Sequence, residues 1–137
     1  MLLFVVGALL VVNVWAVVDA RLAATAAARE AARAFATADS GEALAAANAA
    51  RERTLESQGW ARETLVAGAS SLPRRHERCA EATATVTLRV DPILLPQVGW
   101  TDGFTATGRH TELVNPLRGG LEGPELPAPG EGGSLCS

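Results

Sequence analysis

The seventeen residues that follow Met1 constrain the fold more than any other part of the chain. Between Leu2 and Val18 the only polar side chain is that of Asn13. An α-helix of this length spans about 25 Å, at the short end of what crosses a bilayer. A run this apolar does not suit the core of an ordinary soluble domain. It predicts either a membrane-spanning helix or a signal peptide that is later removed.

The residues on either side of the run favour a span that is kept. No positive charge precedes Leu2, and the sequence Ala-Val-Val that ends the run is a poor cleavage site. Strong helix formers continue after Val18, with no Pro or Gly before Gly41. We therefore expect one continuous helix from Leu2 to Ala38.

The second half of this helix is rich in alanine. Small side chains let helices approach closely, so Ala27 and Ala31 are candidate helix-packing residues. The same pattern is also typical of a good helix former whose charged residues face solvent. Asp19 and Arg21, just beyond the apolar run, are expected to mark the membrane interface.

A second helix and a small sheet are predicted next. Asp39 and Glu42 have the spacing of a capping box, and Gly59 would end the helix that follows. Its apolar stripe is predicted to include Leu44, Ala47, Arg51 and Leu55. Strands are predicted at 62–70, at 82–90 and at 104–114, the last two by clear alternation of apolar and polar residues. The expected fold class is α+β, with a three-stranded antiparallel sheet packed on the second helix.

Three regions follow from this pattern. Residues 1–38 form the transmembrane and extended N-terminal helix, and residues 39–115 form a small α+β domain. Residues 116–137 are dominated by Gly, Pro and Glu, a composition that predicts a flexible tail. Between the last two strands, the apolar segment 93–95 is expected to fold over the core of the sheet, and Trp60 and Trp100 to fill that core.

The composition argues against several classes of function. The net charge is −3 and the Arg residues are scattered among acids, so no basic face for nucleic acid is expected. His76 and His110 lie far apart without a cluster of Cys or carboxylates beside them, which argues against a metal site. No nucleophile, base and orienting group can be assembled, so the chain is not expected to be an enzyme or to hold a cofactor.

The two cysteines leave three alternatives open. Cys79 and Cys136 are too few and too far apart for a zinc site. The tail that carries Cys136 has too few apolar residues to dock by burial, so an intramolecular disulfide would hold it against the domain. Alternatively, the two thiols are independent, or Cys136 pairs with another subunit.

Three stretches of the sequence are distinctive when taken in order: AAAREAARAF (26–35), ATVTLRVDPILLPQVGW (84–100) and ATGRHTELVNPLRGGL (106–121). Together they resemble the TadE-like pseudopilins (TadE/TadF family) of the tight-adherence (Tad/Flp) pilus assembly system, in the form found in actinobacteria. The stretch AAAREAARAF (26–35) resembles the family's signature just beyond the span. ATVTLRVDPILLPQVGW (84–100) resembles its threonine-valine strand and Leu-Leu-Pro loop, and ATGRHTELVNPLRGGL (106–121) resembles its closing strand. Together they cover nearly the whole chain up to Leu121.

The resemblance implies a minor pilin-like subunit, anchored by its helix in the cytoplasmic membrane with the C-terminal domain outside the cytoplasm. Its partners would be membrane lipid, other pilin-like subunits and the assembly machinery. It would act by helix packing, either in a surface pilus or in its assembly base. The alternative is a single-pass membrane protein that presents a small extracytoplasmic binding domain unrelated to pili.

The N-terminus departs from the family pattern. Pilin-like proteins carry a short basic leader, but here apolar residues follow Met1 directly and Val5 replaces the usual acidic residue. Arg21, Arg29 and Arg33 follow the span with nothing basic before it, which by the positive-inside rule favours a cytoplasmic C-terminus. We expect a leader upstream of Met1 to remove this conflict; a family member that is never processed would look the same.

Overall fold

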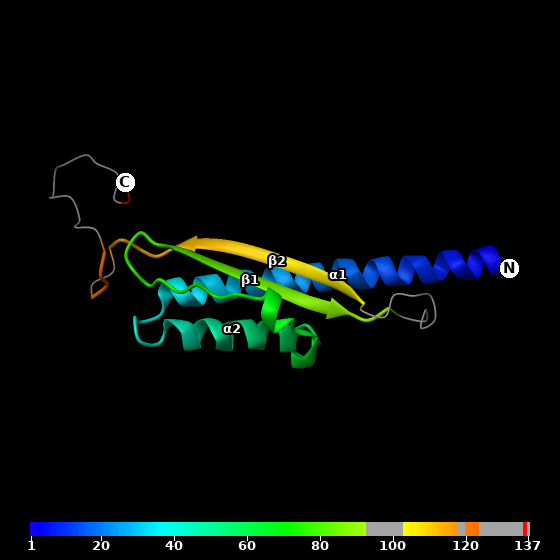
Figure 1. The fold of residues 1–137 in the computed structure, drawn as a ribbon, viewed down its shortest axis with the longest axis horizontal. Helices are drawn as coiled ribbons and strands as arrows, with labels where there is room; N and C mark the ends of the chain where they lie inside the picture. The colour runs from blue at the N-terminus through cyan, green and yellow to red at the C-terminus, as the bar shows by residue number, and fades with distance from the viewer. Residues whose placement is uncertain (93–102, 118–119, 124–135, 137) are drawn as a thin grey trace.

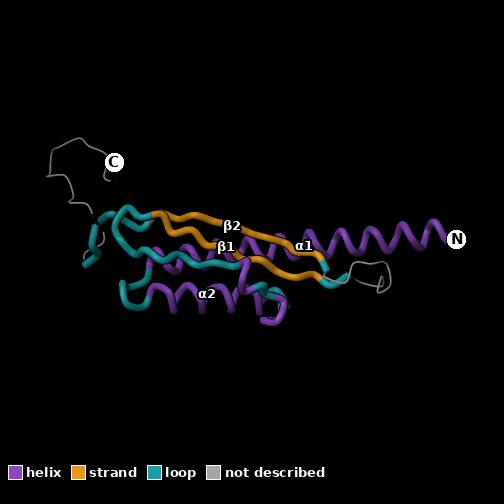
Figure 2. Tube along the Cα trace, viewed as in Figure 1, coloured by secondary structure: helices purple, strands orange, loops and turns teal. Residues whose placement is uncertain are grey.

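The computed structural model describes residues 1–92, 103–117, 120–123 and 136. Helix α1 (Leu2–Thr37) runs along most of the length of the molecule, and α2 (Ala43–Ser57) folds back beside its C-terminal half (Figure 1). Strands β1 (Glu81–Val90) and β2 (Phe104–Leu113) lie along the same half of α1. Two 3-10 turns, η1 (Arg62–Thr64) and η2 (Ala67–Ala69), lie between α2 and β1 in the chain (Figure 2). The predicted α+β class is confirmed.

The continuous N-terminal helix is also confirmed, and it ends one residue before the predicted position. α1 has 36 residues, and its C-cap Ala38 has extended backbone angles. Its first half protrudes beyond the rest of the protein, and its second half packs against α2, β1 and β2 (Figure 1). The predicted packing of the sheet on the second helix is wrong, because among the described elements both strands pack on α1, and α2 contacts α1 and η1 but neither strand. The second half of α1 therefore joins the two layers of the fold.

Alanine makes up most of the core where these layers meet. α1 buries one large side chain there, that of Phe35, among eight alanines: Ala20, Ala23, Ala24, Ala27, Ala28, Ala31, Ala32 and Ala36. The side chains that meet this helix from the sheet include Ala82, Ala84 and Ala106. Because small side chains on both sides leave little between the backbones, the helix and the sheet pack closely. The buried half of α1 is thus part of the core of the domain.

The closest approach is at Gly108 in β2. A Cβ atom at this position would overlap the backbone of Ala24 and Thr25 in α1. A glycine inside a strand often marks such a close backbone approach. No other residue type fits here unless the helix moves away from the sheet.

The two strands form an antiparallel hairpin with the predicted alternation. Val86 pairs with Gly108 at its centre, and Val90 pairs with Phe104 at its closed end. In β1 the inward side chains, at even positions from Ala82 to Val90, are buried against the core. On the outer face, hydroxyl pairs connect the strands, as between Thr83 and Thr111, whose oxygens are 2.9 Å apart.

The predicted third strand at 62–70 is wrong, and the described residues form a two-stranded sheet. This segment does follow the free edge of β1, with isolated bridges from Leu65 to Leu88 and from Ser71 to Thr85. Between these bridges β1 advances three residues, whereas the segment advances six. The surplus is taken up by η2, whose Ala-Gly-Ala sequence lacks the β-branched residues that favour strands. Thr87 compensates by donating its hydroxyl to the carbonyl of Ala69 at 3.1 Å.

The end of α2 agrees with the prediction, but its start does not. Gly59 has φ +78°, and the N–H of Trp60 donates to the carbonyl of Leu55, which completes a Schellman-type ending. At the other end the N-cap residue is Glu42, whose side chain makes no capping hydrogen bond. The expected capping box headed by Asp39 is replaced by a turn in which the N–H of Glu42 donates to the Asp39 carbonyl.

The buried face of α2 is rotated from the predicted stripe. Ala43, Ala47, Ala50 and Leu55 are buried, whereas Leu44 is 53% exposed. The reason is that α2 packs on the alanine surface of α1, and small side chains suit that contact better than leucine. The predicted core position of Leu44 is therefore wrong.

Part of the predicted tail docks on the domain. Leu121 is buried in the main core, and the N–H of Arg78 donates to the carbonyl of Glu122 at 2.8 Å. Trp60 is half-buried against the core, as predicted. The expectations for the apolar segment 93–95, for Trp100 and for most of the tail fall on 93–102, 118–119, 124–135 and 137, outside the described residues.

We predict that Gly108→Ala destabilises the domain. The added methyl group collides with the backbone of α1, and overpacking of this kind costs about 1–3 kcal/mol. Thermal unfolding of the full chain in detergent micelles, followed by far-ultraviolet circular dichroism, measures the effect. Gly68→Ala is the matched control, since nothing lies within 4 Å of a Cβ atom there. Equal melting temperatures for both variants and the wild type would show that the helix is free to move away.

Candidate functional site

The first half of α1 is the largest exposed apolar surface of the described residues. It includes Met1, Leu2, Leu3 and Phe4, each more than 80% exposed, and most side chains as far as Val18 are also exposed. The described residues contain one helix long and apolar enough to cross a membrane, and only 6% of its most apolar window is buried. The core helix of a soluble protein would be mostly buried, so an apolar environment must cover this surface in another way. The helix could therefore span a membrane.

The folded domain begins where the apolar run ends. Ala20 is fully buried with Val90 and Ala106, and Ala16, Val17 and Phe104 pack against this small cluster. Since Val90 and Phe104 form the closed end of the hairpin, that end of the sheet faces the apolar half of α1. Asp19 and Arg21 are exposed at the same level. A bilayer around Leu2–Val18 would lie directly against the domain.

Asn13, the polar residue within the apolar run, forms a side-chain hydrogen bond within its own helix. The side-chain amide of Asn13 donates to the carbonyl of Leu9 at 2.8 Å. This is the common way for a polar side chain to be satisfied inside a membrane helix. It makes Asn13 compatible with a lipid environment without a second helix.

Ala27 and Ala31, the candidate helix-packing residues, both have zero exposure. They face the interior of this chain, where α1 meets α2 and the sheet. The packing surface expected at these positions is therefore used within the protein, and another subunit cannot reach it without unfolding the domain. Around them, the exposed surface of α1 carries charged residues, Arg29, Glu30 and Arg33 among them.

Cys79 and Cys136 are joined by a disulfide, with their Cα atoms 5.3 Å apart. The bond connects Cys79, in the turn before β1, to Cys136, 57 positions later. Cys79 has φ +63°, in the left-handed region that non-glycine residues seldom adopt. Of the three alternatives left open for the two cysteines, the structure has the intramolecular disulfide.

The two histidines lie apart, and the structure gives each a separate environment. His110 Nε2 is 3.3 Å from a Glu112 carboxylate oxygen on β2. His76 packs edge-on against Phe35, with ring centres 5.1 Å apart. Among the described residues, no group of three or more His, Cys, Asp or Glu side chains could hold a metal ion.

No protein-family model, curated protein or solved structure matches the chain. One position that matters in the structure, Gly108, was not among the sequence candidates. The available signal for it was a glycine within an alternating strand.

We predict that Leu10→Arg prevents stable membrane association of the protein. Leu10 is 57% exposed in the apolar half of α1, and an arginine near the centre of a span costs about 2.5–3.5 kcal/mol. Leu113→Arg is the matched control, because Leu113 is 50% exposed but lies on the domain. Carbonate extraction of membranes should release the Leu10 variant and retain the control and the wild type. Retention of both variants would contradict a span at Leu2–Val18.

We also predict that Cys79 and Cys136 are oxidised in protein taken from intact cells. Closing a loop of this length stabilises a fold by about 4 kcal/mol in the chain-entropy model. After alkylation of free thiols, peptide mapping without reductant should recover one cross-linked pair, and Cys79→Ser should lower the melting temperature. Alkylated thiols at both positions would mean a reducing compartment, and so a domain in the cytoplasm.

Proposed function

We propose that the protein is a membrane-anchored minor pseudopilin that takes part in the assembly of a Tad/Flp-type pilus. The observation that carries the proposal is the continuity of α1, whose exposed apolar half leads without a break into the helix that forms the core of the domain. A subunit of this kind needs an anchor in the membrane and a rigid connection from the anchor to the exported domain. One unbroken helix supplies both.

Other subunits would contact the apolar half of α1. The alanines beyond the span are already covered by α2 and the sheet, so they are not free for a neighbouring helix. Within the apolar half, nothing lies within 4 Å of a Cβ atom built at Gly7, and Ala8 follows it. Small residues of this kind allow close helix contacts in lipid, where van der Waals packing drives association.

The disulfide supports an extracytoplasmic domain, because such bonds persist in oxidising compartments. It supports equally the second candidate function, a single-pass membrane protein whose small extracytoplasmic domain binds a ligand without any pilus. The observation that favours this second candidate is the burial of Ala27 and Ala31, which leaves another helix no access to the alanine surface of the domain. The two candidates differ in whether pili depend on the protein.

We predict that deleting the gene in the source organism abolishes or sharply reduces surface pili. The reason is that subunits held together through membrane helices cannot assemble when one essential helix is missing. Counting pili by electron microscopy in the deletion strain, and again after complementation, measures the effect. Complementation with wild type or with Leu113→Arg should restore pili, whereas Leu10→Arg should not. Normal piliation in the deletion strain would reject the pilus proposal in favour of the second candidate.

A further inference from the structure

The closed end of the hairpin lies at the level of the last turn of the apolar run. Phe104 and Val90 pair there, and they share one hydrophobic cluster with Ala16 and Val17 of α1. Both α1 residues precede Asp19, the first charged residue of the helix. In a bilayer that surrounds the run, the hydrocarbon would end near the last apolar residues of the run, and the hairpin end would reach that boundary.

The domain closes around α1 within a short distance of this boundary. The headgroup layer of a bilayer is about 5–8 Å thick on each side. From Val18 to Ala20 the helix rises only about 3 Å. Ala20 is already fully buried, in the cluster with Val90 and Ala106. The hairpin end therefore lies at the depth of the headgroups and cannot stand clear of them.

Two tryptophans lie at the same level as Phe104. Trp15 comes one residue before Ala16 and is 73% exposed. Trp60 follows α2 in the chain and packs, partly buried, against the same cluster as Phe104. Tryptophan is enriched at membrane–water interfaces, where its apolar ring and polar N–H both find a suitable environment. Three separate parts of the chain thus bring aromatic rings to one level.

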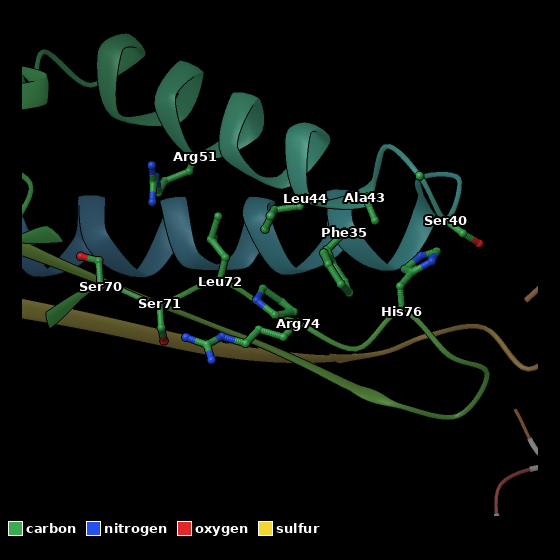
Figure 3. Close-up of a pocket in the computed structure, with 12 residues that line it drawn as sticks. Phe35, Ser40, Ala43, Leu44, Arg51, Ser70, Ser71, Leu72, Arg74 and His76 are labelled. Atoms are coloured by element: carbon green, nitrogen blue, oxygen red, sulfur yellow. The ribbon is translucent and has the colours of Figure 1, made fainter. Parts of the chain in front are cut away.

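The far end of the domain treats its aromatic residue differently. Among the described residues after Val18, Phe35 is the remaining Phe or Trp, and it is only 2% exposed. It lies beside His76, with ring centres 5.1 Å apart, in the lining of a cavity that also includes Ser40 and Arg74 (Figure 3). The partly exposed aromatic rings of the domain are thus found at the end that adjoins the apolar run.

The backbone holds Phe104 firmly in this place. Gly103 precedes it with φ +67°, and a Cβ atom at Gly103 would come within 2.9 Å of the Val90 carbonyl oxygen. A side chain at position 103 would therefore force the two strands apart. The ring of Phe104 is fixed to the end of the sheet rather than carried on a free loop.

The exposed charges at this end carry both signs. Asp19 and Arg21 are exposed on α1, and Arg89 and Asp91 are exposed at the end of β1. Recognition of anionic lipid relies on clusters of Lys and Arg, which this mixture does not form. The mixture suits a zwitterionic headgroup, which also carries one charge of each sign.

We propose that the closed end of the β1–β2 hairpin is a second membrane contact, seated in the headgroup layer of the bilayer that α1 spans. Its partner is zwitterionic phospholipid, with Phe104 at the edge of the hydrocarbon. Interfacial anchors set the tilt and rotation of a span, so this contact would hold the domain in one orientation on the membrane. The proposal rests on the membrane anchor of the proposed function and not on a role in pili.

The test is quenching of tryptophan emission by brominated phosphatidylcholine, in phosphatidylcholine vesicles that carry the full chain. One variant keeps Trp15 and has Trp60→Phe and Trp100→Phe. Two others have all three native tryptophans replaced by Phe and carry either Phe104→Trp or Leu113→Trp. Leu113 is the matched control, because it is 50% exposed at the other end of β2, about 30 Å from Phe104.

We expect the brominated lipid to remove most of the emission of the Trp15 and Phe104→Trp variants and to leave that of Leu113→Trp unchanged. Quenching of Trp15 without quenching of Phe104→Trp would overturn the second contact and leave the anchor in place. No quenching of Trp15 would reject the anchor itself. Equal quenching of Leu113→Trp would also overturn the proposal, because the whole strand would then lie on the bilayer.

A second reporter covers the case in which Phe104→Trp disturbs the core. Thr105 is exposed next to Phe104, so Thr105→Trp places the ring at the same end of the sheet without changing a packed residue. If Phe104→Trp lowers the melting temperature, Thr105→Trp decides the test in its place. Its emission should be quenched like that of Trp15, and unchanged emission would overturn the proposal.

Discussion

The contact between the backbone of α1 and Gly108 is the constraint on which the rest of the structure depends. At this point there is no room for a side chain between the helix and the sheet, since a methyl group would overlap Ala24 and Thr25. Close packing of this kind requires small residues along the whole contact, and α1 supplies a continuous surface of alanine. The same surface then accepts α2 through Ala43 and Ala47. Alanine in α1 therefore serves two purposes, because it favours the helix and it permits both contacts.

Because one helix serves as both candidate anchor and core, the position of the domain relative to a membrane follows from the fold. The closed end of the hairpin packs around Ala20, immediately after the apolar run. Phe35 lies about 25 Å along α1 beyond Val18, the last residue of the apolar run. The end of the domain beside Phe35 would therefore face away from the bilayer. This end and the apolar half lie at opposite ends of α1 (Figure 1).

This separation bears on the two candidate functions. An assembly subunit would use the apolar half of α1, since Ala27 and Ala31 are enclosed within the chain. A binding domain would instead use the surface of the folded part that stays outside the bilayer. The two uses are compatible in one protein, because they involve different residues. The deletion experiment tests the first of them.

The sequence by itself determined the elements whose signals are local. The apolar and alanine-rich run predicted α1, Gly59 predicted the end of α2, and alternation predicted both strands, because helix and strand periodicities and turn conformations depend on near neighbours. Only the tertiary structure decided which surfaces meet. It turned 62–70 into an edge segment with a 3-10 turn, left Leu44 outside the core, and buried Ala27 and Ala31 within the chain. It also brought His76 edge-on against Phe35, 41 positions earlier in the chain. Contacts between distant segments depend on how closely backbones can approach, and that is set by the packing of the whole core rather than by any local pattern.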